Sequence, residues 1–339
     1  MKIEKNKDTE RFFNDAKMSV EQSSILMDKL HKYIAKTISI KDEQEIIKAY
    51  NNYGVNIKTI EYDKNELLEN PYYKNIKFLD IKDKKIHYKN KLLPAKECLN
   101  MSYIKYVDNL FKSYIDIGYL KKSVNIPMLY EGNCIWMSPT IGEQRSMDEP
   151  LNKANGKVLT FGLGIGYYPY MCLLKNNVES ISIVEINKDV IDLFKAHILP
   201  QFKDTKKIDI IQGNMYDYYN EEFLSKFDYI FVDVWKDNDD GLEHYKKLMQ
   251  TGIRKDNMDF WIEPSIIEPI RMLILVYFKS LINKNYTNIL CSMKDTTQRE
   301  FKMVHKYFRT ITKTFSTYDE LLFFINDIST IRNILEIKV

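Results

Sequence analysis

The hydrophobic and polar positions of the chain follow two different patterns on either side of residue 156. Residues 9 to 50 place their apolar side chains at mostly helical spacing, which predicts two or three amphipathic helices. From residue 156 onward, short apolar runs rich in β-branched residues alternate with helical stretches. This alternation predicts an α/β fold, in which helices cover both faces of a doubly wound, Rossmann-like parallel sheet.

The predicted elements of the sheet region are short and regularly spaced. The strands are expected at 158 to 163, 180 to 186, 208 to 212, 228 to 234 and 258 to 263. The helices between them are expected at 168 to 176, 188 to 198 and 241 to 250. After Pro264 the pattern predicts a long helix to about Asn283, and then a mostly helical extension with a candidate strand at 320 to 326.

Two hairpins and a helix are predicted ahead of the sheet. Residues 76 to 93 alternate apolar and charged side chains around a polar turn, and the stretch MLYEGNCIWMSP has a turn at Glu131-Gly132-Asn133. Residues 101 to 121 have helical spacing. We therefore predict a mainly helical N-terminal lobe over residues 1 to 128 and a Rossmann-like domain with a helical extension over residues 129 to 339. The helical N-terminal lobe is a candidate dimerisation surface, so a homodimer is one of the expected oligomeric states.

The composition narrows the classes of partner. The 50 basic and 47 acidic residues give a formal charge of +3, so we expect a small molecule or a protein as partner rather than nucleic acid or an anionic membrane. The four cysteines are scattered and show no metal-ligand spacing with the five histidines, which favours reduced thiols in the cytoplasm and no bound metal. The longest apolar run, 272 to 278, is shorter than the roughly 20 residues that span a bilayer.

Three glycines follow the first predicted strand of the sheet. The stretch VLTFGLGIGYYPYM contains Gly162, Gly164 and Gly166, in a chain with 11 glycines altogether. At the carboxyl end of a parallel strand, glycine allows a tight turn and lets the backbone approach a ligand. A dinucleotide-binding turn has its third glycine five positions after the first, where this chain has Tyr167. A nicotinamide or flavin cofactor is therefore disfavoured, and the spacing suits a nucleoside that carries a sulfonium and an amino acid tail.

Polar residues end the next two predicted strands. Glu185 follows Gly166 by 19 residues, where a carboxylate can accept hydrogen bonds from both hydroxyls of a ribose. Asn214 can pair with the edge of an adenine, and Met215 or Ile186 can supply apolar contact to its ring. We expect these residues to form a nucleoside site.

Acidic residues end the fourth predicted strand. Asp233 points at the expected cleft, and three more aspartates follow it: Asp237, Asp239 and Asp240. Acids at this place favour a cationic guest, and we take Asp233 as a catalytic candidate. Tyr245 is a second candidate, because its ring could hold a cation in the acceptor pocket, as could Tyr167 and Tyr168. His244 is a further candidate, as a general base.

From about residue 129 to 264 the chain resembles the class I S-adenosylmethionine-dependent methyltransferase superfamily, and within it the spermidine synthase (aminopropyltransferase) branch. The similar motifs are VEINKDVIDLF, FDYIFVDVW and the hairpin followed by GEQRSM. The resemblance covers somewhat under half of the chain. It implies S-adenosylmethionine as cofactor and a site built from Gly162, Gly164, Gly166, Glu185, Asn214 and Asp233.

The chain also departs from both branches. Aminopropyltransferases usually have an aspartate in the glycine loop, where this chain has Ile165, and a second aspartate where it has Lys236. Their gate glutamine corresponds to Ile135 or Trp136, and the acid usual in methyltransferases corresponds to Thr160. We therefore expect a methyltransferase that acts on an unidentified small molecule or amine. An aminopropyltransferase using decarboxylated S-adenosylmethionine is the alternative, and a non-catalytic nucleoside-binding protein is the second.

Each site residue also has a purely structural interpretation. The glycines can form a tight turn without a ligand, Glu185 can cap the next helix, and Asp233 can cap the helix after it or pair with Lys236. The later aspartates are expected to form a solvated loop. If the functional interpretation holds, the N-terminal helices and the hairpin at 129 to 147 close over the cleft and exclude water.

Overall fold

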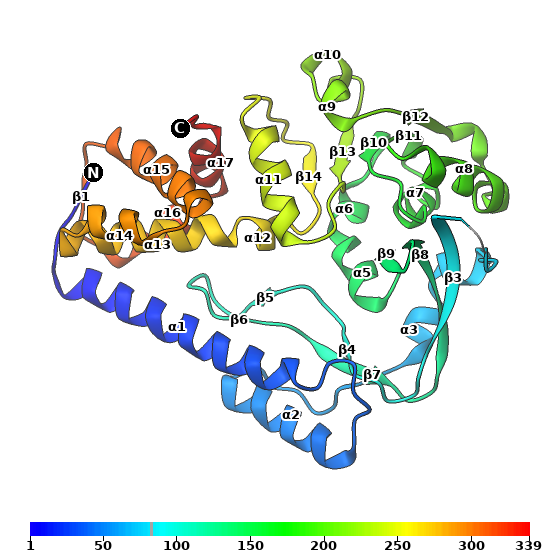
Figure 1. The fold of residues 1–339 in the computed structure, drawn as a ribbon, viewed down its shortest axis with the longest axis horizontal. Coiled ribbons are helices and arrows are strands. Elements are labelled where there is room, and N and C mark those ends of the chain that lie inside the picture. Colours follow the sequence, from blue (N-terminus) through cyan, green and yellow to red (C-terminus); the bar gives the residue numbers. More distant parts are fainter. Residues whose placement is uncertain (82–83) are drawn as a thin grey trace.

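Five parallel strands form the central sheet of the computed structural model, which describes residues 1–81 and 84–339. In sheet order they are β12 (Ile208–Gln212), β11 (Val178–Glu185), β10 (Gly156–Phe161), β13 (Tyr229–Val232) and β14 (Met258–Phe260). Val158, for example, pairs with Ile181 on one side and with Tyr229 on the other. The predicted Rossmann-like fold and its five strands are confirmed (Figure 1).

Helices connect successive strands of this sheet. They are α7 (Tyr167–Leu173), α8 (Lys188–His197), α9 (Met215–Tyr218), α10 (Glu221–Leu224) and α11 (Asn238–Met249), with short 3-10 turns at Leu199–Gln201 and Thr205–Lys207. The last four residues of β10 and all of β13 are buried, which explains their uninterrupted apolar sequence. The strand order reverses between β10 and β13, so a crevice opens there at the carboxyl ends of the strands.

The N-terminal helices confirm the prediction for residues 9 to 50. α1 (Lys7–His31) begins after Asn6, whose side chain caps the first backbone N–H groups. α2 (Ile40–Tyr53) begins after Ser39 and ends at Gly54, which has the left-handed conformation that favours glycine. The two helices pack on each other, and two short helices follow: α3 (Lys64–Leu68) and α4 (Pro71–Asn75).

An antiparallel sheet precedes the parallel one. β3 (Ile86–Leu93) pairs along its whole length with β8 (Val124–Glu131), which also pairs with β9 (Cys134–Met137). The predicted hairpin at MLYEGNCIWMSP is confirmed, with Gly132 in its turn. The hairpin predicted over residues 76 to 93 is wrong, because the strand partner of β3 is β8; part of its expected turn, residues 82 and 83, lies outside the described residues. Two short helices then lead into the parallel sheet: α5 (Ile141–Ser146) and α6 (Asp148–Lys153).

Short strands occupy the segment for which a helix was predicted, residues 101 to 121. They are β5 (Lys105–Tyr106), β6 (Ser113–Tyr114) and β7 (Ile117–Leu120). β7 lies between β2 (Glu61–Tyr62) and β4 (Leu99–Asn100), which are distant in the sequence. The helix prediction is wrong because Ile115, Ile117 and Tyr119 all enter one apolar cluster, a two-residue period that only extended backbone allows.

The C-terminal extension is helical throughout, apart from one short strand. Its helices are α12 (Glu263–Ile266), α13 (Glu268–Asn283), α14 (Tyr286–Ser292), α15 (Asp295–Arg309), α16 (Tyr318–Asn326) and α17 (Ile328–Glu336). The strand predicted at 320 to 326 is wrong, because this segment lies in α16. Thr317 and Glu320 form a capping box at the start of that helix.

The two ends of the chain meet at this extension. β15 (Thr314–Phe315) pairs in parallel with β1 (Lys2–Ile3), and α1 packs against α16. One apolar core contains Phe12 of α1, the parallel sheet and Leu321 of α16. β8 also crosses the boundary predicted at residue 128. The shared core and β8 thus both cross the boundary predicted between the two domains, and the division itself stays a prediction.

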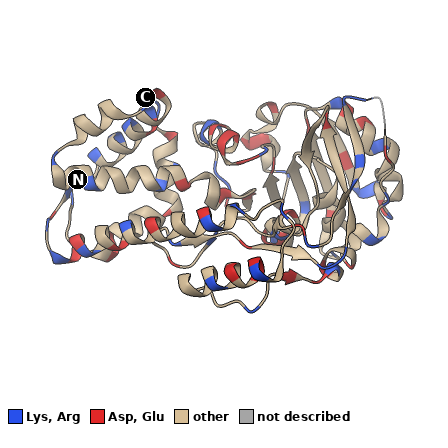
Figure 2. Ribbon diagram, turned by 60° about the horizontal axis from the view of Figure 1, so that its bottom comes forward, with Lys and Arg blue, Asp and Glu red and all other residues tan. Residues whose placement is uncertain are grey.

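Charged residues of both signs are interspersed along the helices and strands (Figure 2). Within residues 1–81 and 84–339, the structure has no helix that combines the length and apolar character needed to cross a membrane.

Candidate active site

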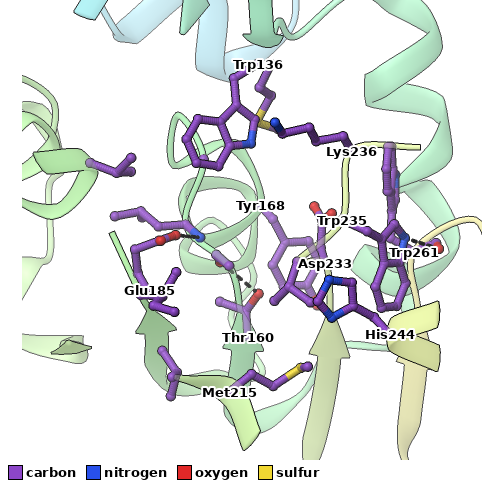
Figure 3. A pocket seen from close by; sticks show the side chains of 18 of the residues that line it. Trp136, Thr160, Tyr168, Glu185, Met215, Asp233, Trp235, Lys236, His244 and Trp261 are labelled. Atoms are coloured by element: carbon purple, nitrogen blue, oxygen red, sulfur yellow. Dashed lines mark hydrogen bonds between the residues drawn. The ribbon is translucent and has the colours of Figure 1, made fainter. Parts of the chain in front are cut away.

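A cavity of about 220 Å³ opens at the carboxyl ends of β10, β11 and β13, where the strand order reverses (Figure 3). Residues of the hairpin β8–β9 and of α5 line it from the side opposite the sheet. A cavity needs about 10–15 Å³ of such volume to hold one water molecule, so this cavity can hold a ligand of many non-hydrogen atoms. This is the position at which open α/β sheets bind ligands.

The glycine loop lines the cavity, but close packing within the protein also requires its glycines. Gly162, Gly164 and Gly166 all have positive φ, of 99°, 53° and 79°. A Cβ at Gly162 would overlap the backbone carbonyl of Asp233, and one at Gly166 would overlap the ring of Phe194. At Gly164 the space of a side chain is taken by the sulfur of Met137, a residue of β9. The first two of these loop glycines line the cavity and Gly166 does not.

Glu185 binds the glycine loop directly. One carboxylate oxygen accepts a hydrogen bond from the backbone N–H of Leu163 at 3.0 Å, and the other accepts one from Asn187 at 2.7 Å. The backbone N–H of Ile186 also bonds to this carboxylate, which leaves it at least one further acceptor site. Burial raises the pKa of Glu185, while the backbone hydrogen bonds oppose this rise. The next helix, α8, is capped by the side chain of Asn187, so the capping role considered for Glu185 is taken by another residue.

The three residues predicted to contact a base also lie at this cavity. Met215 is buried and Ile186 is 62% exposed, and both line the cavity. Asn214 lines it too and caps α9, with its side-chain oxygen accepting the N–H of Tyr216 at 3.1 Å. Its side-chain oxygen is therefore already engaged, and its NH₂ group is the part of the amide suited to a ligand.

Asp233 lies at the end of β13 and faces the cavity (Figure 3). Its backbone N–H donates to Phe161 at 2.9 Å, but no described residue donates a hydrogen bond to its carboxylate. Burial, and then the charges of Glu143 and Glu185, raise the pKa of Asp233 well above its usual range. A half-buried carboxyl group that faces a cavity and has no hydrogen-bond donor from the described residues is typical of a ligand site.

The structural roles considered for Asp233 belong to its neighbours. Asp237 caps α11 in a capping box with Asp240, so the loop aspartates stabilise a helix start. The ammonium group of Lys236 lies over the ring of Trp136, 5.4 Å from its centre. This contact joins the loop after β13 to the hairpin β8–β9 at the edge of the cavity.

The predicted aromatic and histidine residues have different positions. Tyr168 and His244 line the cavity, and the hydroxyl of Tyr216 bonds to His244 Nδ1 at 2.7 Å. Tyr167 points elsewhere, with its hydroxyl accepting a hydrogen bond from Asn70. The prediction that Tyr245 lines the acceptor pocket is wrong in this structure: Tyr245 is fully buried and does not line the cavity.

Tyr245 instead joins three helices. Its hydroxyl donates a hydrogen bond to Glu263 of α12 and accepts one from Arg332 of α17 at 3.0 Å. We expect Tyr245→Phe to lower the free energy of unfolding by about 1 kcal/mol, because Glu263 and Arg332 still pair with each other in the variant. Urea unfolding measures this change. Nucleoside binding should be unaffected, and a loss of binding without a loss of stability would contradict the structural role.

Sequence reasoning missed Glu143, Trp235 and Trp261 as site residues, and named Trp136 only at the position of the gate glutamine. Glu143 lies on α5, in the GEQRSM stretch, and lines the cavity. All three tryptophans of the chain line it as well: Trp136, Trp235 and Trp261. Their rarity was a usable signal, because each adjoins or lies near a motif of the predicted site. The carboxyl groups of the described residues form no cluster that could hold a metal ion.

Comparison with models of known protein families and with curated proteins gives no match. Among solved structures, spermidine synthase from Thermotoga maritima is 16% identical, with a TM-score of 0.31 over 50% of this chain and 60% of that chain. A putative SAM-dependent methyltransferase from Streptococcus mutans is 16% identical, with a TM-score of 0.29 over 44% and 42%. TrmK of M. capricolum, solved with S-adenosyl-homocysteine, is 15% identical, with a TM-score of 0.29 over 49% and 97%. The chain spans less than two thirds of the first two proteins, and likeness at this level bears on neither activity nor substrate.

Proposed function

We propose that the protein binds S-adenosylmethionine in this cavity and transfers its methyl group to a small-molecule acceptor. The observation that supports the proposal is the contact between Glu185 and the glycine loop. This contact places the buried carboxylate of Glu185, which can accept further hydrogen bonds, beside the backbone of the glycine loop. Both lie where the strand order of the parallel sheet reverses. A nucleoside needs such an acceptor pair for its two ribose hydroxyls.

The remaining groups of the cofactor have suitable partners around the cavity. Met215 and Ile186 supply apolar surface for the adenine, and the NH₂ group of Asn214 can donate to its edge. The carboxyl group of Asp233, to which no described residue donates a hydrogen bond, suits the positively charged sulfonium at the reacting end of the cofactor. The donor set therefore fits a sulfonium nucleoside with an amino acid tail.

The chemistry asks little of the protein beyond alignment. S-adenosylmethionine supplies an electrophilic carbon on a sulfonium group, and the acceptor attacks it in line. The residues of this chain hold the reactants in that alignment, which accounts for a large part of the rate gain in such reactions. The hairpin β8–β9, with Trp136 and Met137, covers the glycine loop and excludes water.

Isothermal titration calorimetry tests the proposal by comparing S-adenosylmethionine, decarboxylated S-adenosylmethionine and NAD. We expect saturable binding of S-adenosylmethionine at micromolar concentrations and no binding of NAD, because Tyr167 occupies the place of the third dinucleotide glycine. Methyl transfer is then measured with isotope-labelled cofactor across a panel of acceptors. Preference for the decarboxylated compound would favour aminopropyl transfer, and tight binding without turnover would favour a nucleoside-binding protein.

A further inference from the structure

Glu143 faces the same cavity as Asp233, from a different layer of the molecule. It lies in the first turn of α5, whose start is capped by Thr140. Asp233 follows β13 in the central sheet, and the charge of Glu143 contributes to the raised pKa of Asp233. Two carboxyl groups from different layers of the molecule therefore line one cavity, and each lies within the electrostatic field of the other.

The surroundings of Glu143 hold its side chain in place. The hydroxyl of Tyr103 donates a hydrogen bond to its carboxylate. The ring of Tyr103 packs edge-on against Trp261, with 5.3 Å between the ring centres. Burial raises the pKa of Glu143 to about 7, so the group is poised to exchange a proton near neutral pH.

Trp235 and Trp261 present ring surface rather than hydrogen-bond donors. The indole N–H of Trp261 donates to Ser146 at 2.8 Å, and that of Trp235 donates to the backbone oxygen of Trp261 at 3.2 Å. Their N–H groups are thus satisfied within the protein. The indole rings therefore offer a ligand their aromatic surface, to which organic cations and their carbon chains bind well. Figure 3 shows Trp235 and Trp261 beside Asp233.

No basic side chain of the described residues pairs with either carboxyl group. Lys236, the lysine that lines the cavity, lies over Trp136, and no ion pair joins a described residue to Glu143 or Asp233. Buried carboxyl groups without a cation have raised pKa values, and a bound cation would restore their charged forms. The cavity therefore lacks one positive charge that a guest can supply.

We propose that Glu143 and Asp233 bind the ammonium group of a primary or secondary amine acceptor, and that Glu143 accepts the proton that this nitrogen gives up. The inference rests on the proposed function. Proton transfer to the Glu143 carboxylate frees the nitrogen lone pair, which forms a bond to the methyl carbon. The carbon–sulfur bond breaks, its electron pair passes to sulfur, and the sulfonium becomes a neutral thioether. Glu143 then releases its proton to solvent.

The test uses butylamine and butan-1-ol as probes, with S-adenosylhomocysteine already bound. Calorimetry measures probe affinity, and tryptophan fluorescence independently reports the nucleoside, because every tryptophan of the chain lines the cavity. We expect butylamine to bind more tightly than butan-1-ol, and Glu143→Gln to weaken butylamine at least about tenfold while leaving S-adenosylhomocysteine unchanged. Glu143→Asp, which keeps the charge, should restore part of the affinity. The matched control is Glu149→Gln, an exposed carboxylate on α6 that pairs with Lys153.

The pH dependence provides a second readout. Glu143 pairs with an ammonium group only when ionised, so butylamine affinity should be full above pH about 7 and fall as the pH drops below it. The groups that face Glu143 across the cavity or in contact with it are Tyr103, Asp233, Glu185, Lys236 and His244. Glu143→Gln should remove the part of the profile centred near pH 7. A variant with the wild-type profile would overturn the inference.

The outcomes separate the two proposals. If wild-type protein does not bind S-adenosylhomocysteine, the proposed function fails. If it does, and Glu143→Gln binds butylamine as wild type does, the amine site is wrong while the proposed function stands. Thermal melting of Glu143→Gln and Glu143→Asp shows whether each variant is folded. If Glu143→Gln is not folded, Glu143→Asp still tests the inference, because it keeps the negative charge.

Discussion

Replacing Glu185 with alanine should weaken the binding of S-adenosylhomocysteine by at least about 100-fold. Hydrogen bonds to a charged group contribute about 1.5–3 kcal/mol each, and two ribose hydroxyls would lose their acceptor. At about 1.4 kcal/mol per tenfold change, the loss of both corresponds to two orders of magnitude or more. The variant also removes the acceptor for the N–H of Leu163, which loosens the glycine loop. Calorimetry measures the affinity.

The control for this variant is Asp192→Asn. Asp192 is an exposed residue of α8, the helix that follows Glu185, where it pairs with Lys188. Its loss should leave nucleoside binding within about twofold, because an exposed ion pair contributes little. Thermal melting of both variants separates a binding defect from unfolding. Binding by a folded Glu185→Ala variant at wild-type affinity would refute the nucleoside site.

Gly162→Ala should lower the free energy of unfolding by about 3 kcal/mol or more. Gly162 has a φ of 99°, and a left-handed conformation costs a non-glycine residue about 1–2 kcal/mol. The added Cβ would also overlap the carbonyl oxygen of Asp233, and overpacking typically costs about 1–3 kcal/mol more. Because the obstacle is backbone, the loop that carries Asp233 has to move. Urea unfolding gives the change in stability.

Gly252→Ala is the matched comparison. Gly252 has a similar φ of 75°, but nothing lies within 4 Å of the position of an added Cβ. This variant should show only the backbone cost, about 1–2 kcal/mol. Equal destabilisation by the two substitutions would mean that contact with Asp233 contributes nothing.

The parallel sheet could be predicted because its strands are short, apolar and separated by helices. Burial on both faces gives β10 and β13 an uninterrupted apolar sequence, and this signal is independent of their partners. The carboxyl ends of such strands meet at one edge, so Glu185 and Asp233 could be placed at one cavity from sequence alone. The glycine loop was also located correctly, but much of its glycine requirement comes from Asp233 and Phe194, which no local pattern reveals.

The mispredicted segments depend on distant partners or on a missed local signal. β3 pairs with β8, and β7 pairs with β2 and β4, so neighbours in the sequence do not decide their structure. At 320 to 326 the apolar run suggested a strand, although the Thr317 to Glu320 spacing is a helix-start signal. Glu143 was missed because α5 lies outside the sheet, and only the folded chain brings it to Asp233.

The pairing of β1 with β15 has a consequence for synthesis of the protein. Phe12 of α1 packs against Tyr318, with 5.4 Å between ring centres, so part of its native surroundings is translated some 300 residues after it. At about 5–20 residues per second, α1 leaves the ribosome roughly 15–60 seconds before that partner exists. During this interval its apolar face is open to chaperones or to wrong contacts. Chains released before residue 314 should accordingly be more prone to aggregation and proteolysis than complete ones.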